Sequence, residues 1–391
     1  MSDPLQARHV AAEVVGRVLR EGAFSNVLLD SHASSLPPRD LARVKALTYG
    51  VLRHTERIDH AIEVGARRTI AKVDTGVLDG LRVSVFELLF SDLARPIVVS
   101  AGVDLIRETR PKAAGFANAV LRRVAEQDRE ADQGLDFPAW LTRSLETAWG
   151  AGPAREFAAA SATEPERVVR AMAGAVDVGE ELAGIPGAFV VAPGPIPEGT
   201  TVQDAASIAV GNAVAAEPGM RVIDLAAAPG GKTAHLLDQV GEGGRVVAAD
   251  SHRRRVLDAR SRVPAAKWVV ADARALPFKR ATFDRVLLDA PCSGLGTLRR
   301  RPEIRLRVTE SEVLRLAAGQ REMLERATEL LAPGGRLVYS VCTVTPEETI
   351  DIVAGRGFEP PPIPGEVWGD GRLLAPHITG TDGMFVALLE G

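Results

Sequence analysis

The stretch that decides the fold is Arg221–Thr233, which reads RVIDLAAAPGGKT. Its first five residues, Arg221–Leu225, have the pattern of a buried strand, and a helical pattern follows the proline and glycines over Gly231–Val240. Glycines at a strand-to-helix turn allow a ligand to approach the backbone closely. The first turn of the helix also offers unpaired N–H groups to a carboxylate or phosphate. The stretch therefore predicts a ligand-binding turn at the carboxyl end of a strand.

Strands and helices continue to alternate beyond this turn. The sequence predicts a long helix over Glu312–Leu331 and further strands at Arg245–Ala249, Lys267–Val270, Arg285–Leu288 and Leu337–Val341. Such alternation is typical of a mainly parallel sheet with helices on both faces. We therefore expect an α/β Rossmann-like domain over residues 201–391, with its ligands beyond the carboxyl ends of the strands.

Acidic residues end three of the predicted strands, namely Asp250, Asp272 and Asp289. Asp250 follows the glycines by about 20 residues, where a doubly wound fold presents a carboxylate to ribose hydroxyls. Three acids around one glycine turn suit an adenosine ligand. A structural interpretation stays open, because a Pro-Gly-Gly turn can merely join a strand to a helix and an acid can merely cap one.

A P-loop nucleotide hydrolase is a second interpretation of the same turn. Gly231-Lys232-Thr233 matches the end of G-x-x-x-x-G-K-[ST], and Val286–Asp289 resembles an apolar strand that ends in a magnesium-binding Asp. The pattern requires glycine at position 226, where this chain has Ala226. The preceding alanines also lack the glycine-rich flexibility that lets successive N–H groups surround a phosphate.

Both cysteines of the chain follow predicted strands of the same sheet. Cys292 lies in DAPCSGLGT after the strand that ends near Asp289, and Cys342 lies in YSVCTVTP after the last predicted strand. A single cysteine is more often a small buried apolar residue than a nucleophile. Two cysteines out of a total of 2, both at the ligand edge, favour a chemical role.

The chain before this domain shows two other sequence patterns. Apolar stripes at helical spacing run through residues 1–130, for example Leu41, Val44, Leu47 and Val51, and predict an all-α domain. Residues 131–200 form a weaker pattern in which proline and glycine cluster at Ile185–Gly199, which favours a small α+β connector.

Composition is compatible with RNA binding and with a reducing, cytoplasmic environment. The net charge of −4 comes from the connector, since residues 131–200 carry 4 basic and 10 acidic residues, whereas residues 1–130 carry 19 and 17. We expect no membrane span and no signal peptide, and 2 cysteines are too few for a disulfide framework or a cysteine-based zinc site. No metal ligand set is predicted.

Three segments carry a family resemblance: AAAPGGKTAHLL, LLDAPCSGLGTLRRRPEIR and YSVCTVTPEE. They resemble the motifs of the Sun family of RNA cytosine-C5 methyltransferases. VQDAAS is similar to the segment that leads into the family's catalytic domain, and TDGMFVALLE to its closing hairpin. KAAGFANAVLRRV, in the helical region, resembles the RNA-binding fold of the antitermination factor NusB. The chain departs from the family at Ala226, where many relatives have cysteine, and in the connector, which lacks the usual Arg-Val-Asn signature.

The resemblance implies a chemistry and assigns residues to it. The cofactor would be S-adenosylmethionine (SAM), bound by Ala226, Ala227, Ala228, Pro229, Gly230, Gly231, Lys232, Asp250, Asp272 and Asp289. Cys342 would add to C6 of a cytosine, which makes C5 nucleophilic. Asp289 would stabilise the protonated base, and Cys292 would remove the C5 proton, directly or through water. The resemblance points to 16S ribosomal RNA without fixing which cytosine is modified.

Basic residues crowd the segment directly after the Cys292 motif. Leu298–Arg307 contains Arg299, Arg300, Arg301, Arg305 and Arg307 against Glu303 alone, which predicts RNA phosphate contacts, with a solvated surface loop as the alternative. A non-catalytic RNA-binding or antitermination protein is a further hypothesis, but it would need neither the two thiols nor a SAM site. A monomer is expected.

Overall fold

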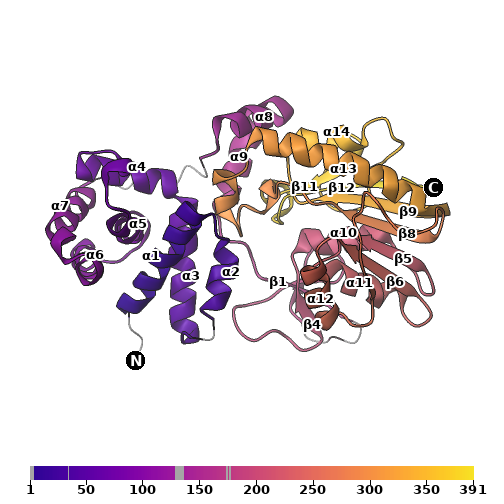
Figure 1. Cartoon of the computed structure of the whole chain (residues 1–391), viewed down its shortest axis with the longest axis horizontal. Helices are drawn as coiled ribbons and strands as arrows, with labels where there is room; N and C mark the ends of the chain where they lie inside the picture. Colours follow the sequence, from indigo (N-terminus) through magenta and orange to yellow (C-terminus); the bar gives the residue numbers. More distant parts are fainter. Residues whose placement is uncertain (1–3, 34, 128–135, 173–174, 176–177) are drawn as a thin grey trace. The chain divides into compact units, whose positions relative to one another are not determined.

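The structure is a computed structural model that describes residues 4–33, 35–127, 136–172, 175 and 178–391. It divides into two compact units (Figure 1). Unit 1 comprises Met1–Phe137 with Arg300–Arg307, and unit 2 comprises Pro138–Arg299 with Val308–Gly391. The predicted boundary between residues 130 and 131 lies outside the described residues.

Unit 1 is built from helices, as the apolar stripes predict. In chain order they are α1 (Pro4–Glu21), α2 (Ser25–Ser31), α3 (Pro38–Arg53), α4 (Thr55–Ala66), α5 (Thr75–Phe90), α6 (Arg95–Thr109) and α7 (Ala114–Ala125). Helix α5 is buried on nearly all sides and contacts α1, α3, α4, α6 and α7. Of its buried charged residues, Arg82 and Glu87 pair with Asp59 and Arg8, and the other helices arrange their apolar faces around it.

The segment Arg300–Arg307 belongs to unit 1 although it follows the Cys292 motif in the sequence. The fully buried guanidinium of Arg305 donates to the backbone carbonyls of Leu52 (3.1 Å) and Arg53 (3.2 Å) and pairs with Glu56 (2.6 Å). The buried carboxylate of Glu303 accepts hydrogen bonds from both the backbone N–H and the hydroxyl of Ser25. The segment therefore completes the hydrogen bonding of the helical unit.

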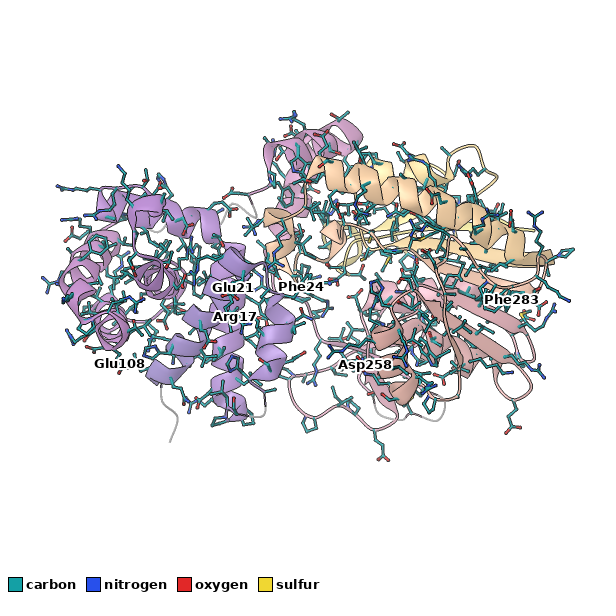
Figure 2. All side chains as sticks on the ribbon, viewed as in Figure 1. Arg17, Glu21, Phe24, Glu108, Asp258 and Phe283 are labelled. Carbon is teal, nitrogen blue, oxygen red and sulfur yellow. The ribbon has the colours of Figure 1, made fainter. Side chains whose placement is uncertain are left out.

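Arg307 is held in the same unit by a different set of contacts. Its guanidinium donates to the carbonyls of Val18, Gly22 and Ala23, where α1 ends and the turn to α2 begins. It also lies over the ring of Phe24, labelled in Figure 2, at 5.3 Å from the centroid. Helix ends leave carbonyls without intrahelical partners, and Arg307 supplies donors for these.

Unit 2 contains an eight-stranded sheet in the order β10-β11-β12-β9-β8-β5-β6-β7. The strands are β5 (Arg221–Leu225), β6 (Arg245–Asp250), β7 (Lys267–Val270), β8 (Phe283–Asp289), β9 (Leu331–Val341), β10 (Glu366–Trp368), β11 (Gly371–Leu374) and β12 (Met384–Glu390). Strands β9, β8, β5, β6 and β7 are parallel neighbours, whereas β12 runs antiparallel to β9. The predicted α/β domain is confirmed.

Helices cover both faces of this sheet (Figure 1). They are α10 (Ala205–Val214), α11 (Gly231–Val240), α12 (Arg253–Arg262), α13 (Glu310–Leu330) and α14 (Ile350–Val353), while the short α15 (Pro376–Thr379) is a further helix of unit 2. One apolar cluster joins α10 and α11 to the sheet, and a separate cluster joins α13 and α14 to it. Strand order reverses between β5 and β8, and ligands bind in the crevice that such a reversal creates.

The connector packs within unit 2 and has the expected α+β composition. It contains α8 (Ala139–Trp149), α9 (Ala151–Ser161) and an antiparallel sheet of β1 (Val168–Ala171), β2 (Glu180–Glu181), β3 (Ala188–Val190) and β4 (Thr200–Val202). Arg170 of β1 is buried and pairs with Asp238 of α11 at 2.6 Å. Within the described ranges, no helix is long and apolar enough to cross a membrane.

We predict that Arg305→Ala lowers the free energy of unfolding of unit 1 by about 3 kcal/mol, since several buried carbonyls lose their donor at once. Thermal unfolding of the full chain measures this change. Arg301→Ala is the matched control, because Arg301 is half-buried and no hydrogen bond to its side chain is seen among the described residues. Equal stability of the two variants would contradict a structural role for Arg305.

Candidate active site

The register of the parallel strands brings the three sequence motifs to one edge of the sheet. Asp289, the last residue of β8, lies opposite Ser340 of β9, and Leu288 lies opposite Leu225, the last residue of β5. The chain leaves all three strands at this edge. Cys292 follows Asp289 by three positions and Cys342 follows Ser340 by two, so both cysteines lie on loops that start at the same level.

The two cysteines are brought together as the sequence predicts. Their Sγ atoms are 3.3 Å apart, both side chains are partly accessible, and no disulfide joins them. A backbone hydrogen bond from Gly296 to the carbonyl of Cys342 (3.0 Å) ties the two loops together. Gly296 has to be glycine, because a Cβ there would collide with the backbone of Gly383.

The environment of the Cys292 thiol makes it a weaker acid than an ordinary cysteine. A hydrogen bond with Cys342 and burial raise the pKa of the Cys292 thiol well above its ordinary value, and negative charge at Cys342 and Glu348 adds to this. Burial works against a charge on Lys232, but Asp289 and the sulfur of Cys342 outweigh it, so the pKa of Lys232 is raised. Lys232 therefore stays a cation beside these groups.

A lysine–aspartate pair lies next to the thiols. Lys232 Nζ contacts Asp289 Oδ2 at 2.8 Å, and the hydroxyl of Ser340 donates to Asp289 Oδ1 at 2.8 Å. Both Asp289 oxygens are thus oriented, while the side chain remains 29% exposed and can still reach a ligand. Ser340 was not identified from sequence, since a serine within a strand gives no signal until the register is known.

The glycine turn has the features of a ligand cradle. Gly230 adopts a φ of 105°, and a side chain there would press on Val263 and Trp268. A Cβ at Gly231 would meet nothing within 4 Å, so the amino end of α11 faces open space. Ala226 also adopts a positive φ, of 58°, at the point where the chain leaves β5.

Asp250 supports this turn from the neighbouring strand. Its buried carboxylate accepts hydrogen bonds from the backbone N–H of Ala228 (3.3 Å) and of His252 (2.9 Å). Arg255 links the same parts, since it approaches Asp250 at 3.4 Å and donates to the carbonyl of Ala228 at 2.6 Å. Sequence reasoning missed Arg255, because its role depends on the fold of the turn.

Two further acids lie nearby in different environments. Asp272 is half-buried, and a hydrogen bond from Arg274 lowers its pKa. Asp224 lies inside the sheet below the turn, where burial raises its pKa to about 7 despite a hydrogen bond from Thr233 at 2.6 Å. Its Oδ1 atom is buried without a hydrogen-bond partner among the described residues. Asp224 therefore belongs to the support of the turn.

These features fit an adenosine-containing cofactor with a charged amino-acid portion. The open amino end of α11 and the turn N–H groups suit a carboxylate, and the carboxylates of Asp250 and Asp272 at two adjacent strand ends suit ribose hydroxyls. The P-loop alternative fits less well, since Lys232 is engaged by Asp289 instead of facing the turn. No cluster of metal-ligating side chains occurs in the described part of the chain.

Three of the arginines predicted to contact RNA use donors within the protein in this structure. Arg299 is buried and donates to the carbonyls of Gly380 and Glu164, and Arg305 and Arg307 use their donors inside unit 1. Charge density alone cannot distinguish solvated arginines from arginines that satisfy buried carbonyls. Arg300 and Arg301 are half-buried, and for these two the expectation remains a prediction.

Comparisons with known proteins agree with this geometry. Residues 212–356 match the family described as 16S rRNA methyltransferase RsmB/F, and residues 5–126 match the NusB family. The ribosomal RNA small subunit methyltransferase B of Thermus thermophilus is 34% identical, with 98% of this chain and 97% of the relative covered. The chain belongs to the RsmB/F methyltransferase family. A putative methyltransferase of Mycobacterium tuberculosis is 33% identical over 98% of this chain and 96% of its own length.

Solved structures share the fold. The structure of PH0851 covers 100% of both chains with a TM-score of 0.80 at 24% identity. NSun6 from Pyrococcus horikoshii, solved with the SAM analogue SFG, covers 65% of this chain and 98% of its own at a TM-score of 0.55 and 20% identity. The helical region is NusB-like, the α/β region is a Rossmann-like methyltransferase domain, and the protein is an RNA methyltransferase with SAM as its cofactor.

We predict that Asp250→Ala weakens SAM binding by about 1–3 kcal/mol, because the turn N–H groups and the ribose hydroxyls lose a buried acceptor. Isothermal titration calorimetry measures this change. Asp258→Ala on the exposed face of α12 is the control, with unchanged affinity expected (Figure 2 labels Asp258). Wild-type affinity in Asp250→Ala would remove Asp250 from the cofactor site.

Proposed function

We propose that this methyltransferase modifies carbon 5 of a cytosine in 16S ribosomal RNA through a covalent bond between Cys342 and C6 of the base. The observation that carries the proposal is the pair of thiols, 3.3 Å apart, beside the Lys232–Asp289 ion pair. A methyltransferase acting on a nucleophilic nitrogen or oxygen needs no thiol. Cytosine C5 becomes nucleophilic only after a nucleophile has added to C6, and a thiolate is suited to that addition.

Cys342 is the proposed nucleophile. The raised pKa of Cys292 favours a protonated thiol there, so we assign the thiolate to Cys342, where the ammonium of Lys232 favours a negative charge. Sulfur addition to C6 places an electron pair on the ring, which the base accommodates with a proton at N3. Asp289, accessible and oriented by two partners, hydrogen-bonds that edge of the base.

Cys292 is the proposed base for the last step. Bound SAM supplies an electrophilic methyl group to C5. The proton on C5 must then leave so that the ring electrons can expel the sulfur of Cys342. Once Cys342 forms a C–S bond it loses its negative charge, so two of the causes that raise the pKa of Cys292 weaken. The pKa of Cys292 therefore falls once the bond to C6 has formed, so this thiol can release its proton to solvent and then, as a thiolate, take the C5 proton directly or through water.

The cofactor is proposed to contact the residues of the glycine turn and the acids around it. They are Ala226, Ala227, Ala228, Pro229, Gly230, Gly231, Lys232, Asp250, Asp272 and Asp289. RNA is proposed to be single-stranded or unstacked at the target, because a stacked cytosine cannot present C6 to a thiol. The NusB-like region, Arg300 and Arg301 are proposed to contact the phosphate backbone.

We predict that the two cysteine variants fail differently. Cys342→Ala cannot form the C–S bond, so it should yield no methylated RNA and no adduct. Cys292→Ala should still allow attack and methyl transfer, but the adduct should persist because proton removal at C5 is slow. A denaturing gel with labelled RNA and SAM should show a protein–RNA band for Cys292→Ala alone.

The double variant is the control for this experiment, and it should show no band. If the band appeared with Cys342→Ala instead, the two roles would have to be exchanged. If neither single variant trapped RNA while both bound SAM normally, the covalent mechanism would be rejected.

We predict that Asp289→Asn, introduced into the Cys292→Ala background, slows adduct formation by about 10² or more, the range typical of a lost acid–base group. The rate of appearance of the protein–RNA band measures this effect. Asp284→Asn is the matched control, since Asp284 lies near the opposite end of β8 and pairs with Arg221. A normal rate for Asp289→Asn would contradict contact with the base.

The target is tested separately from the chemistry. Bisulfite mapping of 16S ribosomal RNA from cells with and without the gene should reveal one protected cytosine that depends on the gene. Protection confined to other RNAs would retain the cytosine chemistry and reject the ribosomal target.

A further inference from the structure

Glu348 is a fully buried acid that lies behind both cysteine loops. It is the last residue of the short 3-10 turn η5 (Pro346–Glu348), six positions after Cys342. Acids are rarely buried completely unless hydrogen bonds satisfy their oxygens. Neither the cofactor turn nor the proposed proton transfers use this side chain, so its burial requires another explanation.

The carboxylate of Glu348 holds the Cys292 loop through Ser293. Oε1 accepts from the backbone N–H of Ser293 at 2.9 Å, and Oε2 contacts the Ser293 hydroxyl at 2.5 Å. Ser293 is the residue directly after Cys292. These two contacts therefore fix the backbone and the side chain of the position that orients the Cys292 sulfur.

The same carboxylate holds the Cys342 loop. Oε2 accepts from the hydroxyls of Thr343 and Thr345, each at 3.2 Å, and Thr343 is the residue directly after Cys342. The hydroxyls of Ser293 and Thr343 also contact each other at 2.7 Å. Two loops that belong to different strands thus meet on one buried side chain.

A second set of contacts fixes Glu348 itself. Gln320 of α13 donates to Oε1 at 3.0 Å and also to the carbonyl of Pro291 at 2.9 Å. The buried Tyr339 hydroxyl donates to the backbone carbonyl of Glu348 at 2.8 Å. The carboxylate of Glu348 is therefore anchored to a long helix and its backbone to the sheet, so the side chain can act as a fixed reference for both loops.

We propose that Glu348 is a positioning residue that sets the separation of the two catalytic sulfurs by bridging Ser293 and Thr343. The inference rests on the proposed function for its chemical meaning, since attack and elimination require both sulfurs at one carbon–carbon bond of the base. Its negative charge also contributes to the raised pKa of Cys292. Glu348 touches neither substrate nor cofactor in this assignment and acts through its neighbours.

A reagent that binds two neighbouring thiols tests this assignment without RNA or SAM. Phenylarsine oxide condenses with two thiols held close together, forms two As–S bonds and releases water, with no change in oxidation state. The chain contains only 2 cysteines, so the reagent reports on Cys292 and Cys342 alone. Loss of thiols reactive towards Ellman's reagent measures binding, and unfolding in denaturant returns the total thiol count.

Wild-type protein should bind one equivalent of the arsenical tightly. Glu348→Ala should bind about tenfold more weakly or worse, the loss expected when hydrogen bonds to a charged group disappear. Glu348→Gln, which keeps the volume and one acceptor oxygen, should fall between them. Asp351→Asn is the matched control, an exposed acid three positions later, and should behave as wild type. The kcat for methyl transfer should fall in the same order, while the KM for SAM stays unchanged.

Three outcomes would overturn the proposal. The first is wild-type arsenical affinity in Glu348→Ala, and the second is a parallel loss of SAM affinity, which would make Glu348 a general fold residue. The third outcome applies if Glu348→Ala does not fold. It is wild-type arsenical affinity in both Glu348→Gln and Thr343→Val. If Glu348→Ala weakened arsenical binding but Cys292→Ala formed no RNA adduct, the covalent mechanism would be rejected. The role of Glu348 in thiol spacing would be retained.

Discussion

The parallel pairing of β8 with β9 is the constraint on which the active site depends. Because Asp289 lies opposite Ser340, the loops that follow begin side by side, and the two thiols meet although they are 50 positions apart in the sequence. A shift of one residue in this register would turn alternate side chains to the opposite face of the sheet. It would separate Asp289 from Ser340 and move Cys342 relative to Cys292. The long β9, paired on its other side with β12, holds the register.

At the carboxyl ends of these strands, the charge of each ionisable group shifts the pKa of its neighbour. Lys232 faces Asp289 and lies within the field of Cys342, whereas negative charge at Cys342 and Glu348 raises the pKa of Cys292. One cation among several potential anions favours a single thiolate over two. In the proposed mechanism the order of steps then follows from electrostatics, because bond formation at one sulfur changes the acidity of the other.

Local signals predicted most of the catalytic sheet. Arg221–Leu225, Gly231–Val240 and Lys267–Val270 coincide with β5, α11 and β7, because apolar runs punctuated by glycine and proline define both the period and the ends of an element. By contrast, β9 begins at Leu331 and not at Leu337. Pro333–Gly335 suggests a turn before the strand, but Leu331 already pairs with Phe283 of β8. Ser340 and Glu348 gave no signal, because their roles arise from residues that only the sheet brings near.

The arginine segment shows why residue type and charge are insufficient for the remaining part of the site. Five arginines in ten positions predict a surface for phosphates if the segment is treated as a loop of the domain in which it lies in sequence. The chain instead leaves that domain at Arg300 and returns at Val308. Within the helical unit a guanidinium has five donors for carbonyls at helix ends, where water is excluded and each unpaired carbonyl costs about 1–3 kcal/mol. Arginine fits position 305 because it supplies many donors at one buried point. The sequence that follows the Cys292 motif is consequently part of the helical unit's own framework, and any search for the RNA surface should begin with side chains that still have donors to offer.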